Sequence, residues 1–291
     1  MPRHTLFRIA GIALVVCAAT LAPDRSAFKA VIFSLGLAHY VTAIAYAKRP
    51  IRQAWSSRTP RLLLLGTVGA SLLAFQQNLS LVLLFGLHHA FNEVYVLDRW
   101  TNLQPDASAP DRVRRLRTAG VWFNLLAYLV ILRKNREVAF INDYVLYLGL
   151  IVSLVFFVRA LMELRPAMKP ATLLDNCGLE LLALVGVALS FRYQFLFLDI
   201  VAFHFCAWLL YPLPAIAKRG TAGVTRFYAL TAALTLGFLA LSEIGPYAQR
   251  TFRIWFLVGS YLHIITAVAI SDAHPGWIRR WFGARPAVAS S

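Results

Sequence analysis

The sequence predicts an all-α protein, a polytopic bundle of about ten transmembrane helices in a single integral membrane domain over residues 1–291. Composition gives the first reason: 59% of the residues are hydrophobic and only 14% are charged, whereas a soluble domain carries about 25% charged residues. The mean hydropathy of +0.63 reflects the same excess of apolar residues. The second reason is the pattern, in which long apolar segments alternate with short basic loops. So little polar surface predicts that the outer face contacts lipid.

The apolar segments follow one another along the chain, and each predicts one helix. A span needs about 20 residues, with about 17 as the lower end. Segments 62–77 and 118–132 are short, so one of them is expected to be re-entrant or to extend into its flanking loop. Segment 5–22 is interpreted as a retained first helix, with a cleaved signal peptide as the alternative. The segments are 5–22, 27–47, 62–77, 78–97, 118–132, 138–162, 171–190, 194–217, 222–242 and 252–272.

The basic residues predict the orientation of these spans. If the N-terminus is cytoplasmic, 21 of the 29 Lys and Arg, Arg8 among them, fall on the cytoplasmic side and 8 on the other. Cytoplasmic loops of membrane proteins are enriched in Lys and Arg. We therefore expect an even number of spans with both termini in the cytoplasm, in the inner (plasma) membrane of a bacterium.

The net charge of +16 has two interpretations, and the position of the charges decides between them. In a soluble domain it would indicate a nucleic-acid partner, but here the charges lie in short loops without a basic and aromatic surface. Contact with anionic lipid headgroups is the better interpretation. The basic run at 112–117, in the longest loop, predicts an interfacial segment on the cytoplasmic leaflet, and a dedicated lipid-headgroup site is the less favoured alternative. The expected partners are membrane lipids and no nucleic acid.

Histidines recur inside the predicted spans, where each ionisable group costs about 2.5–3.5 kcal/mol on insertion scales. His39 lies in the second span, His88 and His89 in the fourth, His204 in the eighth and His263 in the tenth. These four spans run in the same direction, and in each of them the first histidine lies 10 to 12 residues after the start of the span. At about 1.5 Å per residue the depths agree within about 3 Å. The sequence thus predicts one layer of imidazoles near mid-membrane.

A layer of imidazoles indicates a metal site, because neutral imidazole binds iron, copper and zinc. His39, His88, His89, His204 and His263 are the predicted ligands. Glu93 follows His89 by one turn, so it is predicted to be a catalytic base or a carboxylate ligand. His88 and His89 differ by about 100° around the helix, and only one is expected to face a given centre. Membrane histidines also form interhelical hydrogen bonds, which is the competing interpretation.

We expect an integral membrane metalloenzyme with histidine-ligated non-haem iron. Its substrate would be lipophilic: an acyl chain, an isoprenoid, a carotenoid or a quinone. The layout is similar in kind to the bacteriorhodopsin-related-protein-like carotene dioxygenases of bacteria, which place histidine-ligated iron among membrane helices. That similarity is one of architecture, and no residue role is carried over from it. A haem b electron-transfer protein and a non-catalytic proton-coupled carrier are the alternatives, and copper or zinc could replace the iron.

Overall fold

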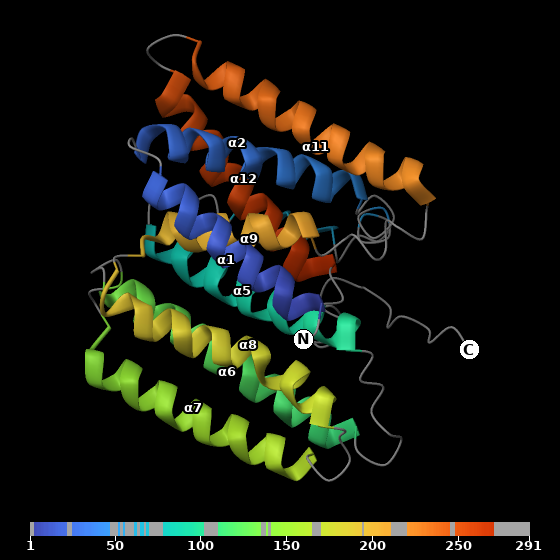
Figure 1. The fold of residues 1–291 in the computed structure, drawn as a ribbon. Helices are drawn as coiled ribbons and strands as arrows, with labels where there is room; N and C mark the ends of the chain where they lie inside the picture. The colour runs from blue at the N-terminus through green and yellow to red at the C-terminus, as the bar shows by residue number, and fades with distance from the viewer. Residues whose placement is uncertain are drawn as a thin grey trace. The chain divides into compact units, whose positions relative to one another are not determined.

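The structure is a computed structural model (Figure 1). It describes residues 3–21, 25–46, scattered positions between 52 and 69, 78–101, 110–134, 138, 141–164, 170–193, 195–210, 220–244 and 248–270. Of the residues it describes, 94% are helical and none forms a strand. The all-α prediction is therefore confirmed for this part of the chain.

The long helices coincide with nine of the predicted apolar segments. The third segment, 62–77, lies mostly outside the described residues, as do the last residues of segment 194–217. The helices are α1 (Arg3–Leu21), α2 (Arg25–Tyr46), α5 (Asn78–Thr101), α6 (Pro110–Lys134), α7 (Asp143–Leu164), α8 (Pro170–Ser190), α9 (Phe197–Leu210), α11 (Gly220–Ser242) and α12 (Ala248–Ile270).

Four of these helices are individually long and apolar enough to cross a membrane. Within the described residues the candidate spans are Ser26–Ala45, Arg112–Lys134, Asp143–Leu164 and Gly220–Ser242. The shorter apolar stretches lie in α5, α8, α9 and α12. These helices identify the chain as a membrane protein. The total of ten spans and the side on which the termini lie stay predictions.

The basic run at 112–117 belongs to a helix and not to a loop, which corrects the predicted boundary of the fifth segment. Helix α6 begins at Pro110, a residue favoured in the first helical turn. Leu116 is 1% exposed and packs with Phe157, Ala160 and Leu164, and Val113 contacts the same cluster. Because Val113 and Leu116 are three residues apart, they share the face that packs on this cluster, while Arg112, Arg114 and Arg115 are exposed.

Helices α6 and α7 pack as an antiparallel pair, and two ion pairs define their register. Arg133 Nε lies 2.6 Å from an oxygen of Asp143 at one end, and Arg115 lies 3.0 Å from Glu163 at the other. Asn142 precedes α7, and its side-chain oxygen accepts a hydrogen bond from Tyr144 N at 2.8 Å. This N-cap explains why α7 begins at Asp143, later than the predicted 138.

The chain divides into two compact units, which are described separately. Unit 1 comprises Met1–Ala10 and Gly86–Ile200, and unit 2 comprises Gly11–Phe85 and Val201–Ser291. In unit 1, α6 contacts both α7 and α8. In unit 2, α2 contacts both α11 and α12 (Figure 1). The division falls within α1, α5 and α9, so each of these helices contributes residues to both units.

Gly86 in unit 1 marks a position where helix packing leaves no room for a side chain. A Cβ there would lie 2.5 Å from a ring carbon of Tyr128. We expect Gly86→Ala to lower the free energy of unfolding by about 1–3 kcal/mol, measured by chemical denaturation in detergent micelles. Gly237→Ala in α11 is the control, since a Cβ there meets nothing within 4 Å. Equal destabilisation by both variants would contradict this packing.

Candidate metal centre

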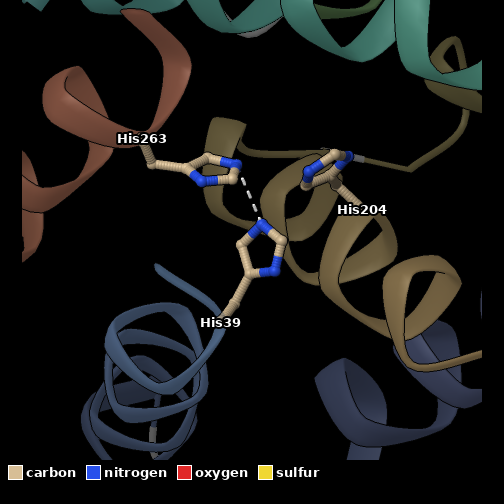
Figure 2. A group of neighbouring side chains, drawn as sticks. All are labelled: His39, His204 and His263. Atoms are coloured by element: carbon tan, nitrogen blue, oxygen red, sulfur yellow. Dashed lines mark hydrogen bonds between the residues drawn. The ribbon is translucent and has the colours of Figure 1, made fainter. Parts of the chain in front are cut away.

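Three histidines from three helices of unit 2 converge. His39 lies on α2, His204 on α9 and His263 on α12, and one ligand nitrogen from each lies within 4.8 Å of the others. Their exposed fractions are 3%, 5% and 9%. Figure 2 shows the imidazoles pointing into a common space, with His39 and His263 closest together. His39 is 165 or more positions along the chain from both His204 and His263. Only folding therefore brings the three residues together.

His39 and His263 approach through their Nε2 atoms, which lie 3.0 Å apart. Two neutral imidazoles at this distance share one N–H···N hydrogen bond, with the donor set by the tautomers. The same separation suits two ligands of one metal. With metal–nitrogen bonds of about 2.0–2.1 Å, nitrogens 3.0 Å apart subtend about 90–97° at the metal. The geometry therefore serves both as a hydrogen bond and as a pair of adjacent metal ligands.

Aromatic rings enclose the His39 imidazole. Trp208 packs edge-on against it with ring centroids 4.3 Å apart. Phe205 lies at 5.4 Å and His204 at 5.8 Å. The Nδ1 atom of His39 is buried without a hydrogen-bond partner among the described residues. Packing by these rings, in place of the hydrogen bond that commonly orients a metal-bound histidine, therefore holds the imidazole.

Tyr40 secures His263 from the neighbouring helix. Its ring stacks on the imidazole of His263, with centroids 5.1 Å apart and planes inclined by 26°. The Tyr40 hydroxyl lies 2.6 Å from Ser260 Oγ. Because Ser260 Oγ donates to the carbonyl of Phe256 at 2.7 Å, the tyrosine is the donor of that bond. A Cβ at Gly259 would lie 2.7 Å from the Tyr40 ring, so glycine there permits the close approach of α2 and α12.

The convergence of His39, His204 and His263 agrees with their matched predicted depths. Their role as ligands stays a prediction. The other predicted site residues, His88, His89 and Glu93, lie on the part of α5 that belongs to unit 1. The group of candidate ligands found among the described residues does not include them.

Within unit 1, α5 residues that lie one turn apart interact with each other. Asn92 Nδ2 lies 2.9 Å from His88 Nε2, so the amide donates and the imidazole accepts. His89 interacts electrostatically with Glu93, one turn later, and with Arg8. The face shared by His89 and Glu93 is thus polar, and it meets a guanidinium group.

The structure shows a partner of Glu93 that the sequence interpretation missed. Arg8 Nε lies 2.9 Å from Glu93 Oε2, and Arg8 Nη2 donates to the Glu93 carbonyl at 3.1 Å. Both residues are 1% exposed. The sequence interpretation counted Arg8 only as a charge at the cytoplasmic end of the first span, and the structure adds that it is buried in an ion pair. Its position inside the apolar segment 5–22 is the signal that could have identified it, because a buried arginine requires a partner.

Two further buried carboxylates have local roles. Asp199 Oδ2 accepts a hydrogen bond from Leu196 N at 2.8 Å, which resembles the reciprocal capping arrangement at a helix start. Glu180 on α8 accepts a hydrogen bond from Asn124 on α6 at 3.3 Å. Neither residue belongs to the histidine group of unit 2.

Searches of protein-family models, curated proteins and solved structures find no match for this chain. The chemistry of the histidine group therefore carries the functional argument.

Proposed function

We propose that the chain is a multi-pass membrane metalloenzyme in which His39, His204 and His263 hold one non-haem iron ion. With dioxygen, this centre oxidises a lipophilic substrate. The single observation that carries the proposal is the convergence of three buried imidazoles from α2, α9 and α12 within 4.8 Å. Burying three polar side chains among apolar helices is costly, and a shared metal ion compensates for that cost.

The number of ligands favours a catalytic role over a structural one. Structural zinc sites bind four protein side chains, whereas catalytic metals keep positions open for water or substrate. Three histidines leave such positions. The 3.0 Å separation of the His39 and His263 nitrogens suits ligands at about 90°, as in five- or six-coordinate iron. A tetrahedral zinc ion would separate them by about 3.3–3.4 Å.

The third histidine lies close enough to join the other two. One ring nitrogen of His204 lies within 4.8 Å of the ligand nitrogens of His39 and His263. Its ring packs edge-on against Phe85, with centroids 5.4 Å apart.

The surroundings of the site favour an apolar substrate. Trp208, Phe205 and Phe85 pack against the imidazoles, and the helices that carry the site are apolar. An acyl chain, isoprenoid, carotenoid or quinone would enter from the lipid, and the same rings would exclude water from the reacting group. The proposal does not depend on His88, His89 or Glu93, whose predicted roles as ligands and base stay predictions.

The distances favour a bare metal ion over haem. Axial histidines on opposite faces of a haem iron place their nitrogens about 4.0 Å apart, with the porphyrin between them. The 3.0 Å approach of His39 and His263 leaves no space for a porphyrin plane there. Trp208 packs against the imidazole of His39, and Tyr40 stacks on that of His263.

For the whole chain we propose ten spans, with both termini in the cytoplasm of a bacterium and the protein in its inner membrane. The asymmetry of Lys and Arg between the loops supports this orientation. Because Arg8 is buried in an ion pair, it can be left out of the count of topological charges, and the asymmetry of the remaining Lys and Arg stays strong.

The test is purification in detergent followed by metal analysis and a visible spectrum. We expect about one iron per chain and no Soret band, as for a non-haem site. A Soret band would replace this proposal with the haem b protein. Zinc alone would rule out oxygen chemistry at the site, since zinc has no redox activity. If neither metal nor haem copurifies, the histidines form a hydrogen-bonded cluster and the metalloenzyme proposal is wrong.

A further inference from the structure

Three arginines converge at one end of the α6–α7 pair in unit 1. Arg115 Nη2 lies 3.0 Å from Glu163 Oε2, and Arg159 Nε lies 3.4 Å from Glu163 Oε1. Arg112 Nη1 donates to the backbone carbonyl of Glu163 at 3.4 Å. The carboxylate and the backbone carbonyl of Glu163 together gather three guanidinium groups, which leaves a local excess of two positive charges.

These arginines are accessible, unlike Arg8. The side chains of Arg159 and Arg115 are 75% and 57% exposed, and that of Glu163 is 34% exposed. Exposed ion pairs contribute little to stability, about 0–1 kcal/mol each. Packing of the helices alone therefore does not account for the convergence. Guanidinium groups bind phosphate in bidentate fashion.

A shallow, open apolar groove lies on one face of α7 beside this charged cluster. Its volume is about 650 Å³, and its lining is Leu154, Val155, Val158, Arg159, Met162 and Glu163. Val155 and Met162 are more than 60% exposed. Arg159 and Glu163 belong to both features, so the groove leads into the arginine cluster.

We propose that this surface is a binding site for one acidic phospholipid, with the phosphate at Arg112, Arg115 and Arg159 and an acyl chain in the groove. Charge complementarity identifies the headgroup, and the apolar groove identifies the chain. The location of the cluster supports this proposal. The cluster lies at the start of the candidate span Arg112–Lys134 and at the end of the antiparallel candidate span Asp143–Leu164. That is the level at which a headgroup meets a membrane protein.

The test measures lipid binding to the full-length protein by native mass spectrometry and by titration in micelles. We expect phosphatidylglycerol to bind at least tenfold more tightly than phosphatidylcholine. The double variant Arg115→Gln with Arg159→Gln is expected to weaken phosphatidylglycerol binding about thirtyfold. Arg133→Gln is the matched control, because Arg133 forms a similar ion pair with Asp143 at the opposite end of the helix pair, and it should leave binding unchanged.

A second variant tests the groove separately from the charge. Val158→Trp fills the groove without changing any charge, and it should weaken binding of the two-chain lipid. It should leave binding of inorganic phosphate, measured in parallel, unaffected. Equal binding by wild type and the double-arginine variant would overturn the proposal. Tight binding of inorganic phosphate that competes with the lipid, together with no effect of Val158→Trp, would show a free-anion site and would also overturn it.

Discussion

Replacement of His39, His204 or His263 by alanine is expected to reduce bound metal from about one per chain to below about a tenth after gel filtration. Each substitution removes one of three ligands, and the two that remain hold a metal far more weakly. The positions lie on three different helices, so loss of metal from all three variants would show that they act on one ion. Metal analysis of detergent-purified protein gives the measurement.

Thr42→Val is the matched control for these variants. Thr42 lies on α2, about one turn from His39, and is fully buried. Its hydroxyl has no hydrogen-bond partner among the described residues, so valine preserves the shape and leaves no group unsatisfied. We expect it to retain the metal. Retention of metal by any of the three histidine variants would exclude that residue as a required ligand.

Breaking the buried ion pair of unit 1 is expected to have the largest effect on stability. Glu93→Met leaves the Arg8 guanidinium buried beside an apolar side chain, and Arg8→Met leaves a buried carboxylate. Removing one member of a buried pair costs about 3–5 kcal/mol, because the other charge is no longer compensated. The free energy of unfolding, measured by denaturant titration in micelles, should fall by that amount in each single variant.

The double variant separates the ion pair from packing. With Arg8→Met and Glu93→Met together, no charge is left uncompensated, and an apolar replacement of a buried pair is often neutral. We expect the double variant to recover most of the lost stability. Arg115→Gln, which breaks the exposed pair with Glu163, should cost less than about 1 kcal/mol. If the double variant is as unstable as the two single losses combined, Arg8 and Glu93 act independently and the pair does not stabilise the fold.

The helical architecture could be predicted because hydrophobicity and span length act locally. The apolar segments correspond to helices because, in a membrane, only a helix satisfies every backbone group within one segment. Helix ends were harder to predict. Pro110 and the alternation of Val113 and Leu116 with arginines extend α6 into what seemed a loop, and this amphipathic pattern is local enough to be read in advance.

The histidine site was predictable through depth, and its neighbours were not. His39, His204 and His263 are costly residues at matched predicted depths, which predicted one layer of imidazoles. Depth did not predict which of these histidines meet, because His88 and His89 have the same predicted depth and do not belong to the group found among the described residues. The stacking of Tyr40 on His263 and the packing of Trp208 on His39 depend on helix rotation, which a single sequence does not determine. The partner of Arg8 was missed for a related reason, because a charge near a helix start resembles a topological signal until its partner on another helix is known.

X-ray absorption at the iron edge of the purified wild-type protein tests the central claim most directly, since it reports the atoms bound to the metal. The account predicts a first shell that includes three imidazole nitrogens at about 2.0–2.1 Å, with the outer-shell scattering of imidazole rings. In His263→Ala the imidazole signal and the bound iron should both be lost. A porphyrin first shell, sulfur ligands or iron binding that is unchanged in His263→Ala would contradict a metal centre built from His39, His204 and His263.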